Sequence, residues 1–359
     1  MNNEKKPPIQ RTLVIVIAAL VGLTVLLGIG YLLFPWNTPL DSPLDLGITA
    51  SLDETTTTIE QDTRTQTLES QISPSPTLEP VCGGPPTMTV LVSGVASKDN
   101  YLYGLADAIR LVRIDFRTQE ATVLALPRDL WVEIPRLESR GITVGKLNQA
   151  YFYGTEGMGY YQGGGYGAGL LAETLLANYD LRVDHYVSVN LGSFRQIINE
   201  LGGINVYLAQ DVYKRVNDQP ELFLKAGSHH LNGKQAEILA RQRIEIGDYG
   251  RINNQTVILK AVAAKLFTPA GLMRVPGLFN QLRDDVRTDF SPAEITQLVC
   301  LAERMDLQED ISFVTLPNEL VEEKWVFDPS RERNTAALVA VDGEDIRRLL
   351  EEFQAGIWP

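Results

Sequence analysis

Three arginines, an aspartate and a glutamine lie close together late in the chain, in a pattern suited to binding an anion: Arg241, Arg243, Asp248, Arg251 and Gln255. Arg241 and Arg243 are two residues apart and share a side only in extended chain, whereas the last three follow at helical spacing. Guanidinium groups near a helix N-terminus favour the binding of phosphate, because each guanidinium group donates paired hydrogen bonds to phosphate oxygens and the free backbone amides of the helix donate further ones. The pattern predicts a phosphate or pyrophosphate site; a surface Asp–Arg pair with exposed arginines is the alternative.

Other polar residues interrupt apolar segments earlier in the chain. Asp107 lies just ahead of a predicted strand that begins at Ile109, Arg128 and Asp129 follow the end of the next strand, and Lys146 opens the stretch Lys-Leu-Asn-Gln-Ala-Tyr. Ligands collect at strand ends in α/β sheets, because backbone groups there need partners and side chains converge. The alternative interpretation is that Asp107 is a turn residue and that Arg128 and Asp129 form a surface ion pair.

Composition excludes several kinds of site. A net charge of −13 argues against binding nucleic acid, since such a surface repels phosphate backbones. Cys82 and Cys300, the only cysteines, lack the spacing of a zinc site and form either one disulfide or two ordinary thiols. His185 falls inside a predicted strand and His229 and His230 in a predicted turn, so all three are interpreted as structural.

These residues must be positioned by an α/β domain. Apolar β-rich runs cover residues 87–93, 109–116, 121–126, 185–190 and 204–209, and helical patterns cover 170–178, 193–201, 234–240, a segment that opens at Pro292, and 345–353. Strands interleaved with helices predict a three-layer domain over residues 87–320, with a central mixed β-sheet and helices on both faces. Residues 321–359 are expected to form a C-terminal cap or appended element.

The N-terminal part predicts a membrane anchor. Residues 12–34 form an apolar stretch long enough to span a bilayer as one transmembrane helix. Lys5, Lys6 and Arg11 precede this stretch and acidic residues follow it, so residues 1–11 are expected in the cytoplasm and the rest outside. A cleaved signal peptide is the competing interpretation. Residues 35–86, rich in Ser, Thr and Pro, are expected to be a disordered linker.

Seven segments in the same order carry a resemblance to a known family: Asp-Ala-Ile-Arg-Leu-Val at 107–112, Leu-Pro-Arg-Asp at 126–129, Lys-Leu-Asn-Gln-Ala-Tyr at 146–151, Asp-His-Tyr-Val at 184–187, Leu-Gly-Gly-Ile at 201–204, Leu-Asn-Gly-Lys-Gln-Ala at 231–236, and the cluster at 241–255. Together they resemble the LytR-CpsA-Psr family of cell-wall glycopolymer ligases. The resemblance covers about residues 87–317.

The resemblance implies an apolar groove for a polyprenyl chain, with its pyrophosphate held by arginines and a magnesium ion. It implies catalytic roles for Asp107, Arg128, Arg241, Arg243, Asp248 and Arg251, and substrate binding by the four arginines with Lys146 and Gln255. Asp107 would bind the metal, and Asp248 would orient the arginines or assist acid–base chemistry. Family members usually carry a second carboxylate where this chain has Ala96, and Asp99 is the candidate replacement.

The implied reaction transfers a phosphate-linked glycopolymer from a polyprenyl pyrophosphate carrier to peptidoglycan. Such phosphoryl-type chemistry needs charge neutralisation more than a covalent nucleophile. Two other functions use the same residues: hydrolysis of the lipid pyrophosphate, and non-catalytic binding or sensing of lipid-linked glycans. The expected partners are the lipid-linked glycan, peptidoglycan and the membrane.

Overall fold

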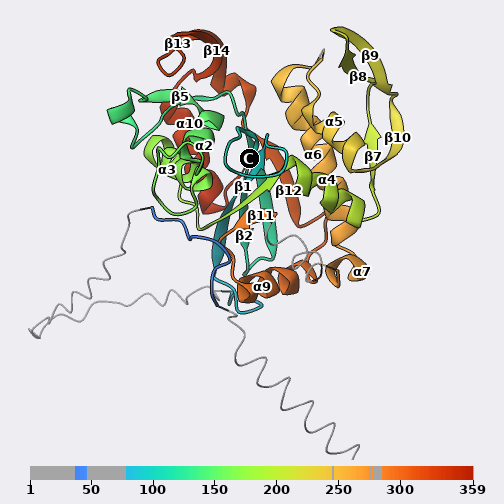
Figure 1. Ribbon diagram of the computed structural model, residues 1–359. Coiled ribbons are helices and arrows are strands. Elements are labelled where there is room, and N and C mark those ends of the chain that lie inside the picture. The colour runs from blue at the N-terminus through green and yellow to red at the C-terminus, as the bar shows by residue number, and fades with distance from the viewer. Residues whose placement is uncertain (1–36, 47–77, 245, 275–276, 278–284, 359) are drawn as a thin grey trace, which may run out of the picture.

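The computed structural model describes residues 37–46, 78–244, 246–274, 277 and 285–358 (Figure 1). The predicted cytoplasmic tail and transmembrane helix, residues 1–34, lie outside these ranges. Among the helices of the described residues, none combines the length and apolar character that crossing a membrane requires.

A six-stranded mixed sheet forms the centre of the molecule. Its spatial order is β11 (Val286–Thr288), β6 (His185–Asn190), β1 (Thr87–Val95), β2 (Ala106–Asp115), β3 (Glu120–Leu126) and β12 (Ile311–Thr315). β1 runs parallel to β6 and β3 runs parallel to β12, while the other neighbours are antiparallel. The mixed α/β class expected from the sequence is confirmed.

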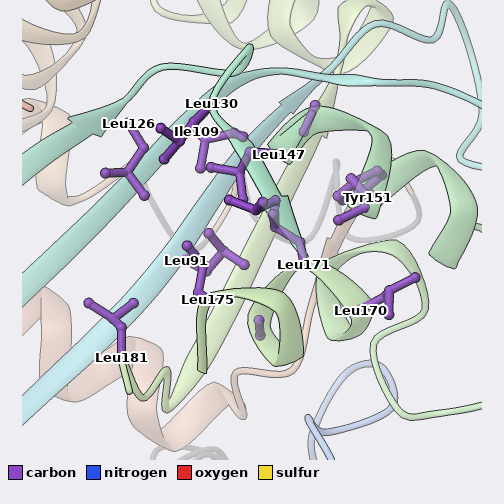
Figure 2. Close-up of a cluster of buried hydrophobic side chains, with 14 of the residues drawn as sticks. Leu91, Ile109, Leu126, Leu130, Leu147, Tyr151, Leu170, Leu171, Leu175 and Leu181 are labelled. Atoms are coloured by element: carbon purple, nitrogen blue, oxygen red, sulfur yellow. The ribbon is translucent and has the colours of Figure 1, made fainter. Parts of the chain in front are cut away.

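One face of the sheet packs against α2 (Leu147–Gly154), α3 (Gly167–Tyr179) and α10 (Gly343–Ala355). Leu91 and Ile109 of the sheet meet Leu147, Leu171 and Leu175 in one buried cluster (Figure 2). Alternation along the strands explains this layer, because every second residue of β1 and β2 points to the same face.

The C-terminal residues belong to this layer rather than to a separate element. Ile346, Leu350 and Phe353 of α10 are buried in the same core cluster as the central strands. The strands β13 (Val321–Asp328) and β14 (Arg333–Ala340) form a hairpin, and Leu130 bridges to Leu338. Residues 321–358 are therefore part of the domain, because α10 is amphipathic and its apolar face completes the core.

The opposite face is covered by α4 (Leu191–Glu200), α5 (Gly233–Arg241) and α6 (Gly247–Leu266), with α9 (Pro292–Ala302) at one end (Figure 1). Side chains of α4, α5 and α6 form a second cluster with β7 (Ile204–Leu208) and β10 (Gly227–Leu231). Asn232 caps α5 and Ser291 caps α9, each in a capping box. Helices therefore lie on both faces of the sheet.

The remaining elements are short and mostly peripheral: β4 (Trp131–Glu133), η1 (Glu138–Arg140), β5 (Val144–Lys146), β8 (Val212–Val216), β9 (Gln219–Leu224), α7 (Pro269–Leu272) and η2 (Asn318–Leu320). Two local predictions need correction. Asp107 lies inside β2 rather than ahead of it, and His229 and His230 lie in β10 rather than in a turn, because pairing with β7 extends this segment.

Residues 37–46, which fall within the predicted disordered linker, lie against the domain. The Arg287 Nη1 atom is 2.8 Å from Asp41 Oδ2, and the Leu40 amide donates to the Phe290 carbonyl at 3.3 Å. Leu44 packs on the main core. The linker prediction is therefore wrong for this stretch, because its few apolar and acidic side chains find partners on the folded domain.

Cys82 and Cys300 form a disulfide that joins the segment before β1 to α9. The sequence left this pairing open, because spacing alone does not decide which distant cysteines meet. The bridge closes a loop of 218 residues, which contains the sheet strands β1, β2, β3, β6 and β11.

Candidate active site

A groove of about 450 Å³ lies between the sheet and the helices α4, α5 and α6. Its apolar wall comes from the sheet residues Val92, Ala108 and Val189 and from the helix residues Phe194, Ile197, Ile198, Ile258, Leu259 and Val262. Charged side chains also line it: Asp107, Arg110, Arg128, Glu237, Arg241, Arg243 and Arg251. The residues Ile258, Leu259 and Val262 of α6, which follow Gln255, therefore face the groove.

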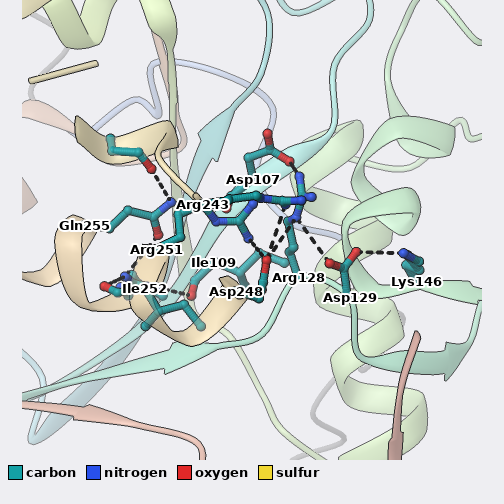
Figure 3. Close-up of polar contacts among 12 residues, drawn as sticks. Asp107, Ile109, Arg128, Asp129, Lys146, Arg243, Asp248, Arg251, Ile252 and Gln255 are labelled. Carbon is teal, nitrogen blue, oxygen red and sulfur yellow. Dashed lines mark hydrogen bonds and ion pairs between the residues drawn. The ribbon is translucent and has the colours of Figure 1, made fainter. Parts of the chain in front are cut away.

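Three arginines surround one carboxylate where α5 ends and α6 begins (Figure 3). Asp248 Oδ1 is 2.7 Å from Arg251 Nη2, 3.3 Å from Arg243 Nη2 and 3.8 Å from Arg128 Nε. Arg128 Nη1 also donates to the carboxylate of Asp107. The alternative of a separate surface Asp–Arg pair does not hold, because Arg251 is only 3% exposed.

The connection between α5 and α6 places these arginines. α5 ends at Arg241, one residue later than the sequence predicts, and Gln242 is extended. The Gln242 side chain accepts hydrogen bonds from the amides of Arg243 and Ile244 at 2.7 and 2.9 Å, which fixes the turn. Gly247 adopts a φ of 63°, a conformation that glycine reaches without strain, and the chain then enters α6.

A β-bulge turns Asp107 toward the same place. Val95 pairs with Ala106 and Gly94 pairs with Ala108, so Asp107 is an extra residue on β2 with no partner across β1. Bulges of this kind redirect a side chain next to a functional site. The sequence pattern does not reveal the bulge, which explains why the strand was expected to start later.

Burial shifts the pKa values of Asp248 and Arg251 in this cluster. Burial raises the pKa of Asp248 above its usual value even though Arg251 opposes the shift. Burial, and then the nearby Arg128, lower the pKa of Arg251. Within the described part of the chain, both carboxylate oxygens of Asp248 and the Nε atoms of Arg128 and Arg251 lack a well-aligned hydrogen-bond partner. Guanidinium donors that are close to a charge but not fully bonded suit an additional anion.

Other predicted residues occupy different surroundings. Arg241 lines the groove, but its side chain is 56% exposed and pairs with Glu237 at 3.0 Å. Lys146 is not part of the groove wall; its Nζ atom is 3.0 Å from Asp129 Oδ1, and Asp129 in turn lies 3.6 Å from Arg128 Nε. Lys146 therefore contacts the cluster only through Asp129.

Gln255 and Arg110 complete the inner part of the groove. Gln255 Oε1 accepts a hydrogen bond from Arg110 Nη2 at 3.2 Å, and Gln255 Nε2 donates to the Ala240 carbonyl at 3.3 Å. The sequence reasoning gave Arg110 no role. The sequence feature that could have pointed to Arg110 is its charge: it lies two positions from Val112 on a strand face that is otherwise apolar.

The carboxylates of the described residues suit a magnesium site with one protein ligand, and not a site in which several carboxylates coordinate the ion. Asp99 is exposed and does not line the groove; it lies beside Gly192 at the start of α4. Among the residues that the structure describes, no three His, Cys, Asp or Glu side chains gather as metal ligands. Asp107 alone can hold a Mg²⁺ ion whose other ligands are phosphate oxygens and water, which is how Mg²⁺ is often bound.

Comparison with known proteins identifies the fold family. The model of the LytR_cpsA_psr family matches residues 46–352. The chain belongs to this family. It is 25% identical over 275 residues to the polyisoprenyl-teichoic acid–peptidoglycan teichoic acid transferase TagU of Enterococcus faecalis, covering 74% of this chain and 78% of that protein.

A second relative is the transferase of the same name from Halalkalibacterium halodurans, 28% identical over 205 residues, 56% of this chain and 60% of that protein. The crystal structure of Bacillus subtilis TagV superimposes with a TM-score of 0.58 at 22% identity, over 75% of this chain and 97% of TagV. This likeness confirms the fold.

Proposed function

We propose that this LytR-CpsA-Psr protein transfers a phosphate-linked glycopolymer from a polyprenyl pyrophosphate carrier to peptidoglycan. The observation that carries the proposal is an apolar groove with Arg128, Arg243 and Arg251 gathered around Asp248 at its charged end. An apolar chain and a doubly anionic head group need this combination of surfaces. The names of the two curated relatives, both teichoic acid transferases, support the same reaction class.

In the proposed reaction a sugar hydroxyl of peptidoglycan attacks the phosphorus nearer the donor sugar. A new P–O bond forms, the bond to the bridging oxygen breaks, and its electron pair leaves on polyprenyl phosphate. The hydroxyl proton passes to Asp248, whose pKa burial raises. The arginines neutralise the charge on the phosphate oxygens, which is the main requirement of phosphoryl transfer.

A divalent cation would fit at Asp107. When bound there, Mg²⁺ would neutralise phosphate charge and polarise the P–O bonds. We propose Asp107 as its protein ligand. Asp99 is not proposed as a ligand, because it lies beside Gly192 at the start of α4 and does not line the groove. The anchor over residues 12–34 would hold the domain outside the cytoplasm near its lipid substrate.

The double variant Arg241→Ala/Arg243→Ala tests the proposal. Both side chains are substantially exposed, 56% and 41%, so their ion pairs contribute only about 0–1 kcal/mol each to folding. We expect transfer to be lost while the melting temperature changes little. Arg195→Ala, which removes another Glu237 partner, is the matched control and should transfer normally.

Product analysis separates the alternative functions. Transfer requires that the glycan appears on peptidoglycan, whereas hydrolysis would release free glycan phosphate at the same rate with or without the acceptor. A non-catalytic binding protein would hold the lipid without turnover at any magnesium concentration. Full transfer by the double arginine variant would contradict the assigned site.

A further inference from the structure

Arg110 is a buried arginine inside the groove that the transfer mechanism does not use. It lies on β2, lines the apolar wall and is only 3% exposed. Its guanidinium group donates to three neutral acceptors: the Ile109 carbonyl at 3.2 Å, the Ile252 carbonyl at 3.3 Å and Gln255 Oε1 at 3.2 Å. These bonds fix its orientation but do not use every N–H donor that a guanidinium group carries.

No carboxylate of the described residues forms an ion pair with Arg110, although the other clustered arginines each have one. Burial, and then the like charge of Arg251, lower its pKa to about 10, so it stays charged at neutral pH. Burying a charge without a counter-charge is costly. Arg113 on the same strand shows the usual arrangement, with Asp115 at 3.2 Å.

Arg110 lies deeper in the groove than the charged cluster at its mouth, which consists of Arg128, Arg243, Asp248 and Arg251. It follows Asp107 by three residues along β2, which corresponds to about 10 Å of strand. The Asp107 side chain is 28% exposed, whereas Arg110 is almost fully covered. Gln255 links the two levels, because it accepts from Arg110 and donates to the Asp107 carbonyl at 3.4 Å.

We propose that Arg110, held by Gln255, binds the lipid-side phosphate of the substrate, while Arg241 and Arg243 at the mouth bind the sugar-side phosphate. This inference rests on the proposed function. It assigns Arg110 to the leaving group: when the bond to the bridging oxygen breaks, the new negative charge stays on polyprenyl phosphate, beside Arg110. The buried guanidinium would thus receive its counter-charge from the substrate and retain it in the lipid product.

Two lipids with the same chain separate the two arginine levels. Full-length protein in detergent is titrated with farnesyl monophosphate and with farnesyl pyrophosphate, and the dissociation constants are measured by calorimetry. Because charge-assisted bonds to a buried phosphate are strong, we expect Arg110→Leu to weaken monophosphate binding about tenfold or more. Arg241→Ala/Arg243→Ala should weaken pyrophosphate binding but leave monophosphate binding within about twofold.

Stability provides a second readout. Arg110→Leu removes a buried charge that has no counter-charge, which favours folding, and also three hydrogen bonds to neutral acceptors, which disfavours it, so the melting temperature should change little. The matched control is Arg113→Leu, which breaks the pair with Asp115 and should lower the melting temperature without changing either affinity.

The outcomes are distinct. The inference is supported if Arg110→Leu loses monophosphate binding while Arg241→Ala/Arg243→Ala retains monophosphate binding. Equal losses of monophosphate binding in both variants, or unchanged monophosphate binding in Arg110→Leu, would overturn it. If the wild-type protein binds neither farnesyl lipid, the proposed function itself fails and the role of Arg110 fails with it.

Discussion

Asp248 is the shared partner of three arginines, and Asp248→Asn tests whether it organises the site. The substitution keeps the shape of the side chain but removes its charge. Arg251, 2.7 Å away and 3% exposed, is then left buried without its partner. Breaking a buried pair costs about 3–5 kcal/mol, and because burial already disfavours the charged form of Asp248 and raises its pKa, the net loss is expected at the low end, about 3 kcal/mol. For a chain of this size that corresponds to a fall in melting temperature of about 6–12 °C.

Two further results should accompany this loss in Asp248→Asn. Transfer should fall by about 100-fold or more, because the proposed proton acceptor is gone. Inorganic pyrophosphate should bind at least as tightly as to the wild type, since the cluster is now more positive, and at 100 times its dissociation constant should restore about 2.7 kcal/mol. Differential scanning fluorimetry with and without pyrophosphate measures both stability terms. An unchanged melting temperature, or transfer within about twofold of the wild type, would refute this role of Asp248.

Three other predictions concern the groove, the disulfide and acid stability. Ala108→Phe should fill the groove and weaken farnesyl pyrophosphate binding about tenfold, but leave inorganic pyrophosphate binding within about twofold, as calorimetry would show; equal effects on both ligands would contradict the groove assignment. Cys82→Ser/Cys300→Ser should lower the free energy of unfolding in urea by about 2–5 kcal/mol, and an unchanged midpoint would show that the bridge does not stabilise the fold. Burial favours a higher pKa for Asp115, but hydrogen bonds from Arg117 outweigh it and lower the pKa, so Asp115→Asn should be about 1–3 kcal/mol less stable at pH 7. That difference should narrow below about pH 4, because the wild type loses this contribution as its carboxylate protonates; a constant difference down to pH 3 would contradict it.

Local patterns were sufficient for the parts of the fold that depend on neighbouring residues. The two-residue spacing of the arginines predicted a helix end at residue 240, one residue before the observed end of α5 at Arg241, and Pro292 marked the start of α9. The helical spacing correctly predicted that Asp248 and Arg251 pair across one turn of α6 and that Arg251 and Gln255 share the side that lines the groove.

Features that depend on distant contacts could not be predicted in the same way. The bulge that turns Asp107 inward exists only through pairing with β1, and residues 37–46 lie on the domain because Arg287 lies opposite Asp41. Arg110 was missed for a related reason. A single arginine in a strand is ordinary in a sequence, and only the packing of α6 over β2 shows that its surroundings lack a carboxylate.

The most direct test is a crystal structure of the protein with a polyprenyl pyrophosphate bound. We expect an apolar chain along the groove between Ala108 and Val262, with phosphate oxygens within about 3 Å of the Arg128 and Arg251 guanidinium groups. A lipid chain bound elsewhere on the domain, or phosphates that contact neither arginine, would contradict the proposed function.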